Sequence, residues 1–428
     1  MMRRGFSSAA RTVEQKISKL PNGLTVASIE NGAPISQLVL AFRAGTRYEQ
    51  PDEQGFVHYL RNSVGTDSKN YLGVKLLWQT GNIGATLNSF GTKDIFAVQL
   101  ATPREGTPIG VSLLGELGQP AFKPWEVADI ADTIKTDLNS MEAYDIVIEM
   151  LHKAAFRNGG LGRSNTAKPY NVGKINHKKL ESFAKSRLLT GEAAIIGINV
   201  NHDLLLQYAS EQITLPEGKG KEPTASPYKG GEVRLSGPGN MSHVAVTAEG
   251  AKLSDLKSVA TQAVLASLIA GSPVTKFSSN NGFGVVAKTI NKESQSPVGV
   301  TSVNISYSDN GLVGFYLVTE GSQAGILTKK AIAAVKSLAS DVNAEAFEIA
   351  KQQTLTEILL RCENDSDVAI DQAVQILSNA NPISPVAFTD MVQSVTIDDV
   401  KKAASKFNGK LSISSYGVID NVPYLDEL

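Results

Sequence analysis

Three polar residues near position 60 have types and spacing that could do chemistry. His58, Arg61 and Asn62 stand at positions i, i+3 and i+4 of a segment that reads GFVHYLRNSVGT from Gly55. On an α-helix these positions are neighbours on one face. Apolar residues occupy the opposite face: Phe56, Tyr59, Leu60 and Val64. The segment therefore predicts a helix over 54–64 whose polar side brings an imidazole, a guanidinium and an amide together.

This spacing matches an inverted zinc motif, H-x-x-E-H, in which two imidazoles bind the metal and the glutamate activates its water. Only the first histidine is present here. Arg61 is permanently cationic, so it cannot act as a general base and would repel a dication. Asn62 offers a neutral amide, which is a poor substitute for an imidazole at zinc. One zinc ligand out of the three required makes no site. The alternative is an ordinary surface helix with a polar side.

The composition of the chain excludes several classes of protein. Its 428 residues exceed the roughly 250–300 at which a single core stops growing, so two domains are expected. Hydrophobic residues make up 42% and charged residues 19%, which is typical of a globular protein and too apolar for disorder. Lys and Arg number 41 against 42 Asp and Glu, without a long basic cluster, so nucleic acid is not an expected partner.

The cysteine and histidine content offers no second place for a metal. Cys362 is the single cysteine, which excludes an internal disulfide and suits a reducing compartment. The five histidines are widely scattered. No apolar run reaches the roughly 18 residues needed to span a bilayer. We therefore expect no cofactor, no redox centre and no membrane span.

The first residues have the composition of a mitochondrial transit peptide. Residues 1–11 contain three Arg, two Ser and no acid. Arg4 stands three residues before Ser7, which resembles a matrix processing site. A disordered basic tail is the alternative. We expect residues 1–15 to be a transit peptide and a disordered start.

Hydrophobic periodicity predicts an α+β order of elements before residue 215. The expected strands are Leu24–Ile29, Leu38–Arg43, Ala85–Phe90, Ile95–Ala101 and Ala193–Val200. The expected helices are 54–64, a second one soon after it, Gly110–Leu117, a long one from Val127 to Phe156 with a candidate break near Tyr144, and His177–Leu188. Residues 215–227 are rich in Pro, Gly and charge, which is linker composition.

The order of elements repeats beyond this linker. The counterparts are Ile35–Gly45 and Met241–Gly250, Ile95–Leu100 and Val313–Val318, Gly110–Leu117 and Leu327–Leu338, the long helix and Ala344–Cys362, Ile175–Leu180 and Ile397–Lys402, and Ala193–Val200 and Leu411–Gly417. Two similar α+β halves of roughly 200 residues follow. We divide the chain into a first domain at 16–215, a linker at 216–232 and a second domain at 233–428.

The chain resembles the pitrilysin-type zinc peptidase family, which includes the mitochondrial processing peptidase and the core proteins of ubiquinol–cytochrome c reductase. The likeness covers nearly everything after residue 15. It lies in Leu20–Leu24, Ala44–Glu49, the His58 helix with Gly65-Thr66, Leu151–Phe156 with the loop 159–162, and Ser306–Tyr316. The resemblance implies two homologous peptidase-like halves, with the zinc helix in the first.

The resemblance also implies a third zinc ligand, a glutamate on the long helix. Counting back from Leu151-His152 places Lys135 at or next to that position, with Asp132 and Asp137 as the nearest acids. The family's general base and two of its ligands are then replaced by Arg61, Asn62 and Lys135. We expect no catalytic residue and no bound metal. We also expect Arg61→Glu with Asn62→His to leave the site incomplete while Lys135 remains.

Two non-catalytic branches of the family remain. The non-catalytic processing-peptidase subunit carries a long Gly-rich loop in its second half, whereas the corresponding segment here, 270–284, is short and has three Gly. A core protein is therefore the closer match. The resemblance implies a structural and assembly role on the matrix side of the inner membrane, as a peripheral subunit. The implied partners are a second core protein, cytochrome b, cytochrome c1 and the Rieske protein.

Two other functions stay open at this point. One is a substrate-binding subunit of a processing peptidase, which would assist a catalytic partner with an intact H-x-x-E-H motif. The other is a degenerate peptidase fold that acts alone as a matrix scaffold.

Overall fold

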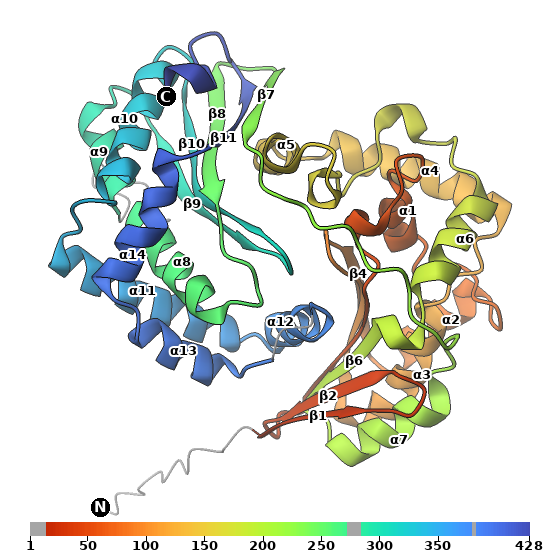
Figure 1. Ribbon diagram of the computed structural model, residues 1–428. Helices are drawn as coiled ribbons and strands as arrows, with labels where there is room; N and C mark the ends of the chain where they lie inside the picture. Colours follow the sequence, from red (N-terminus) through yellow and green to blue (C-terminus); the bar gives the residue numbers. More distant parts are fainter. Residues whose placement is uncertain (1–13, 272–283, 379–381) are drawn as a thin grey trace, which may run out of the picture.

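The computed structural model describes residues 14–271, 284–378 and 382–428, and Figure 1 shows two halves, each a sheet with helices packed on it. The transit peptide expected at the start of the chain lies, up to residue 13, outside the described residues. So do residues 272–283, which make up most of the loop 270–284. Both predictions therefore stay untested.

The first sheet has the strand order β1-β2-β6-β3-β5-β4. Its strands are β1 (Glu14–Lys19), β2 (Thr25–Glu30), β3 (Ile35–Phe42), β4 (Thr86–Gly91), β5 (Phe96–Pro103) and β6 (Ala193–Ile198). β2 and β6 run parallel, and the other pairs are antiparallel. The predicted strands Ala85–Phe90 and Ile95–Ala101 are confirmed as β4 and β5, which pair antiparallel. β1 had no counterpart among the predicted strands.

Except for α5, the helices of the first half cover one face of this sheet. The helices of this half are α1 (Phe56–Asn62), α2 (Gly73–Asn82), α3 (Thr107–Leu117), α4 (Pro124–Asn139), α5 (Ala143–Phe156), α6 (His177–Arg187) and α7 (His202–Gln212). Leu38, Leu40 and Phe42 of β3 are buried against them, as the alternation predicts. The long helix predicted from Val127 to Phe156 is interrupted between Asn139 and Ala143, close to the candidate break near Tyr144, and forms α4 and α5. α7 was not predicted.

The second sheet repeats the first, with the order β7-β11-β8-β10-β9. Its strands are β7 (Gly231–Ser236), β8 (Met241–Glu249), β9 (Gly299–Ser306), β10 (Gly311–Glu320) and β11 (Ser412–Gly417). β11 pairs parallel with β7, as β6 does with β2. The two sheets therefore have five strands in equivalent positions. The strands β2, β6, β3, β5 and β4 of the first sheet correspond in order to β7, β11, β8, β10 and β9 of the second. The predicted α+β fold with two homologous halves is confirmed.

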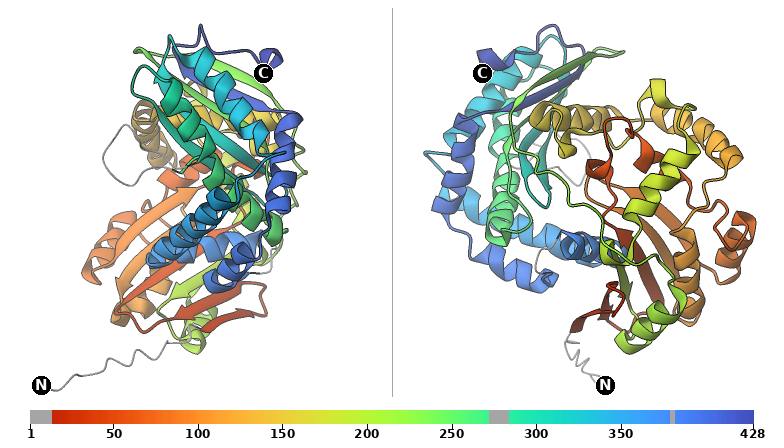
Figure 2. Two further views of the ribbon diagram at one scale, coloured as in Figure 1. Left: turned by 90° about the vertical axis from the view of Figure 1, so that its left-hand side faces the viewer. Right: turned by 45° about the vertical axis from the view of Figure 1, so that its right-hand side comes forward.

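Helices also follow one another in a similar order in the second half. They are α8 (Leu256–Ile269), α9 (Val285–Glu293), α10 (Ala324–Ser337), α11 (Ala344–Cys362), α12 (Asp365–Leu377), α13 (Pro385–Gln393) and α14 (Ile397–Ala404). Most of them lie on the outer side of the second sheet, as the two views in Figure 2 show. The exact domain boundaries at 215, 216–232 and 233 stay our prediction.

Each half contributes one helix to the space between the two sheets, and that helix packs on the sheet of the other half. α5 of the first half packs its buried side chains, among them Val147, Leu151 and Phe156, against the second sheet. α12 of the second half packs Ala369 and Ala373 against β3 and β6 of the first. Figure 1 shows both helices between the sheets. Each sheet is therefore covered on its inner face by the other half, and the two halves share their cores.

Candidate functional site

The short helix α1 is held at its start by a buried carboxylate. Gly55 has φ +101°, a conformation that favours glycine, and it turns the chain into the helix. Glu49 accepts hydrogen bonds from the backbone N–H of Gly55 (3.2 Å) and of Val57 (2.8 Å). Burial raises the pKa of Glu49 to about 8, although these two hydrogen bonds act against the shift. This anchor fixes the direction in which the polar face of α1 points.

The structure brings the predicted trio together, and all three side chains meet one carboxylate of α4. Asp137 Oδ2 lies 3.0 Å from His58 Nε2, 2.6 Å from Arg61 Nη2 and 3.4 Å from Asn62 Nδ2. Asn62 also donates to the carbonyl oxygen of His58 at 3.0 Å. The polar face of α1 is therefore tied to α4 through one oxygen atom of Asp137.

Both ring nitrogens of His58 have partners. Nδ1 accepts from the backbone N–H of Ala167 at 3.1 Å, so the neutral ring carries its proton on Nε2 and donates it to Asp137. The ring is buried, and this burial lowers the pKa of His58 despite the neighbouring carboxylate. Partial burial disfavours the charge of Asp137, yet the hydrogen bond from His58 and the charge of Arg61 lower the pKa of Asp137.

The structure corrects the placement of Lys135. Its ammonium pairs with Asp132 at 2.8 Å, and its side chain is 60% exposed. Asp137, which sequence reasoning named only as a nearby acid, is the residue of α4 that faces His58. Side chains two residues apart on a helix point in directions that differ by about 200°. An error of two positions in the count therefore places the expected side chain on the opposite face of α4. Counting back from Leu151 gave that error, since the path includes the break between α4 and α5.

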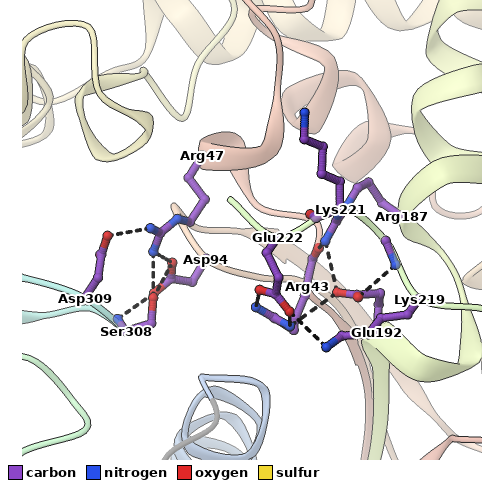
Figure 3. Close-up of polar contacts among 11 residues, drawn as sticks. Arg43, Arg47, Asp94, Arg187, Glu192, Lys219, Lys221, Glu222, Ser308 and Asp309 are labelled. Atoms are coloured by element: carbon purple, nitrogen blue, oxygen red, sulfur yellow. Dashed lines mark hydrogen bonds and ion pairs between the residues drawn. The ribbon is translucent and has the colours of Figure 1, made fainter. Parts of the chain in front are cut away.

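Sequence reasoning missed a second polar site, where the two halves meet. Arg47 follows β3, and its guanidinium lies 2.6 Å from Asp94 Oδ1 and 2.8 Å from Asp309 Oδ2 (Figure 3). It also donates to Ser308 Oγ at 2.6 Å, while the backbone N–H of Ser308 donates to Asp94 Oδ2 at 3.2 Å. Arg47 and Asp94 belong to the first half and Asp309 to the turn between β9 and β10. We call Arg47, Asp94, Ser308 and Asp309 the junction.

Two of the segments that carry the family likeness contain residues of the junction. Arg47 lies in Ala44–Glu49 and Asp309 in Ser306–Tyr316. Nothing in either segment alone indicates that the two side chains pair, because they are far apart in the sequence. Beside the junction, His152 Nε2 lies 2.7 Å from the hydroxyl of Tyr307, and burial lowers the pKa of His152 to about 4.

The linker is bound along its length instead of being a free chain. Arg43 pairs with Glu222 through both carboxylate oxygens, at 3.1 and 2.6 Å, and this hydrogen bonding lowers the pKa of Glu222 to about 2 (Figure 3). Arg187 donates to the carbonyl oxygen of Lys221 at 2.8 Å. Further along, the backbone N–H of Ser226 donates to Asp309 of the junction at 2.9 Å. The composition of the linker is typical of flexible segments, but these hydrogen bonds hold it in place.

The described part of the chain, 14–271, 284–378 and 382–428, holds no group of three or more His, Cys, Asp or Glu side chains placed to bind a metal ion. A search of the same residues finds no helix long and apolar enough to cross a membrane.

Comparison with protein families gives two matches. Residues 25–169 match the model described as insulinase (peptidase family M16), and residues 165–354 match the peptidase M16 inactive domain. Together the two matches run from residue 25 to residue 354, through the first half and into the second.

Comparison with known proteins gives relatives in mitochondria. Cytochrome b-c1 complex subunit 2 of Rattus norvegicus is 30% identical over 420 residues, covering 97% of this chain and 92% of the relative. The Homo sapiens protein of the same name is 30% identical over 418 residues, covering 96% and 92%. Mitochondrial-processing peptidase subunit alpha-2 of Dictyostelium discoideum is 24% identical over 435 residues, covering 99% and 96%.

Among solved structures, one chain of "Complex III2 from Candida albicans, Inz-5 bound" has a TM-score of 0.83 with 17% identity, covering 96% of this chain and 98% of that chain. At this identity the likeness shows a shared fold.

Proposed function

This chain belongs to peptidase family M16, and from that premise we propose that it is a non-catalytic core subunit of mitochondrial complex III, ubiquinol–cytochrome c reductase, in the place of core protein 2. It would have a structural and assembly role that supports electron transport. The observation that carries the proposal is the likeness to cytochrome b-c1 complex subunit 2, which runs through nearly the whole length of both chains.

The proposal includes the loss of peptidase chemistry, and the polar face of α1 supports it. A zinc ion would need His58 Nε2 and Asp137 as ligands, but these two groups are bonded to each other. Arg61 places a fixed positive charge 2.6 Å from the same carboxylate oxygen. Asn62 places an amide where the H-x-x-E-H motif has its second imidazole. These residues do not fit a zinc ion, and we derive no hydrolytic step from them.

The partners and location follow from the same proposal. We expect the chain to pair with a core protein 1 homologue and to associate with cytochrome b, cytochrome c1 and the Rieske protein. It would lie on the matrix side of the inner membrane as a peripheral subunit. The basic start of the chain would direct import and be removed by cleavage before Ser7. Amino-terminal sequencing of the mature protein tests this last point, and an intact Met1 or Met2 would refute it.

Affinity purification from mitochondria tests the proposed assembly. The full chain, tagged at its carboxyl end, is captured from mild-detergent extracts, and the co-purified polypeptides are quantified. We expect cytochrome b, cytochrome c1 and a second M16 chain to be recovered with it in equal amounts. Recovery of the tagged chain without cytochrome b would refute the assignment.

A processing-peptidase subunit is the second candidate, because relatives of that class also match along the chain. The sequence of the second M16 chain in the purified assembly separates the two candidates. A partner with an intact H-x-x-E-H motif and a cleavage activity of the pair on presequence peptides would favour the processing role. A partner without these features supports the structural role alone.

A further inference from the structure

The face of α2 that points away from the core is apolar. Val74 is 74% exposed, Trp78 68% and Leu77 49%, and these three positions are neighbours on a helix. Leu72 and Tyr71, just before the helix, are 58% and 44% exposed. Soluble monomers rarely leave so many large apolar side chains together in water. Neither the polar face of α1 nor the junction uses this surface.

The helix presents this surface in a fixed position. Leu76 is buried in the core of the first half. A Cβ atom on Gly73 would lie 2.4 Å from the carbonyl oxygen of Gly65, so only glycine allows α2 to approach so closely. Leu77 rests partly on Gly65, where an added Cβ would lie 3.1 Å from its Cδ2. The exposed side chains are therefore carried by a rigid element, which lowers the entropic cost of binding.

A second exposed tryptophan lies at the start of α4, which is connected to the start of α2. The chain has two tryptophans, and Trp125, in the first turn of α4, is 62% exposed. Asp67 connects the starts of the two helices, because its carboxylate pairs with Lys123 and accepts from the backbone N–H of Gly73. Its own N–H donates to Glu126 at 2.9 Å. We call Tyr71, Leu72, Val74, Leu77, Trp78 and Trp125 the α2 surface.

The charge around the α2 surface is positive on the side of α2. No acidic residue occurs between Asp67 and Asp94, while Lys69 and Lys75 are exposed there. The ammonium of Lys75 lies 4.8 Å from the ring centroid of Tyr71, at the edge of the apolar side chains. The nearest acid of α3, Glu116, already accepts from Ser68 and Asn70 at 2.7 and 2.8 Å. A complementary surface would carry carboxylates at its rim.

We propose that the α2 surface docks a different protein subunit, one whose contact area is apolar at its centre and carries Asp or Glu at the rim next to Lys69 and Lys75. Exposed Trp and Tyr on a rigid helix are typical of the central residues of such interfaces. The proposal holds whether or not that subunit belongs to complex III.

The charges argue against a lipid surface with anionic headgroups as the occupant. Such a surface would face Asp129, which is exposed on α4 at i+4 from Trp125. A protein with its own pattern of charges can satisfy both the basic side of α2 and this carboxylate.

Photocrosslinking in intact mitochondria tests the proposal. Trp78 is replaced by the photoreactive benzoylphenylalanine in the full chain, and the products are identified by mass spectrometry. We expect a crosslink to another polypeptide, in a segment that contains Asp or Glu. A product with lipid, a product with a second copy of this chain, or no protein product would overturn the proposal.

A matched pair of substitutions completes the test. Val74 and Val386 are both the second residue of their helices, α2 and α13, and are 74% and 68% exposed. We expect Val74→Asp to lower the crosslink yield at least about tenfold, as the loss of a central interface residue does, and Val386→Asp to change it less than about twofold. Equal effects of the two would overturn the proposal. Recovery of cytochrome b in the affinity purification of the full chain reports separately on the proposed function.

Discussion

At the scale of single residues, one oxygen atom, Asp137 Oδ2, binds the whole polar face of α1. Three side chains of α1 point toward it, and His58 and Arg61 lie within 3.0 Å. The sequence indicated that His58, Arg61 and Asn62 share a helix face, because i, i+3 and i+4 spacing fixes that. The sequence could not indicate which residue of α4 contacts them, because counting back from Leu151 crosses the break between α4 and α5. Asp137 in place of Lys135 also changes what a rebuilt site should do.

We predict that Arg61→Glu with Asn62→His creates a zinc site. The double variant would offer two imidazoles four residues apart and, from Asp137, a carboxylate released from its guanidinium partner, which completes three ligands. Zinc per chain is measured after dialysis, and about one ion is expected for this ligand set. Asn62→His alone is the control and should bind little, because Arg61 still holds Asp137. Equal zinc contents of the two variants would contradict our reading of the site.

His152 gives the protein a predictable response to acid. Burial lowers the pKa of His152 from the ordinary 6.5 to about 4, so only the unfolded chain takes up this proton between these values. The free energy of unfolding should therefore fall as pH decreases from 6.5 to 4, by an amount of the order of 3 kcal/mol from this group. Urea unfolding at several pH values measures the slope. His152→Gln should flatten it, and an unchanged slope would disprove the assignment.

At the scale of elements, the sequence predicted the parts with strong local patterns. Strands β3, β5 and β6 have clear apolar runs, and the repeated order of strands followed from them. β1 is mostly polar, and α7 begins directly after the turn that follows β6, so neither stood out. The exchange of α5 and α12 could not be predicted. Periodicity tells which face of a helix is apolar, but not which sheet covers it.

We predict that Leu151→Ala destabilises the whole protein. Leu151 of α5 is fully buried against the second sheet, so its truncation leaves a cavity between the halves and should cost about 2–5 kcal/mol of unfolding free energy. Leu359→Ala on α11 is the matched control. That leucine is 56% exposed, and the change should be below about 0.5 kcal/mol. Two separate unfolding transitions for the Leu151 variant would argue against a shared core.

At the scale of the whole molecule, the junction and the bound linker hold the halves together. Arg47 contacts carboxylates from both halves, and Ser226 of the linker reaches one of them. The linker composition gave no indication of this, since Pro, Gly and charged residues are also common in free chains. A fixed relation between the halves suits a subunit that works by fitting against neighbours.

We predict that Arg47→Met weakens this connection. Removing the guanidinium leaves the buried carboxylate of Asp94 without its ion pair, which should cost about 3 kcal/mol. Hydrogen exchange should accelerate at residues 306–310 and 222–226. Arg104→Met is the control. It removes an exposed pair with Glu30, in which both side chains are more than a third exposed, and should cost at most about 1 kcal/mol. Similar losses for both variants would show that the junction is not special.

Native mass spectrometry of the untagged complex tests the central claim most directly, because it reports partners and bound metal together. We predict that the purified ubiquinol–cytochrome c reductase contains this chain in equal number with cytochrome b, and that the released chain has the mass of its polypeptide alone. A released chain that carries one zinc ion, or a complete complex that lacks this chain, would contradict the account.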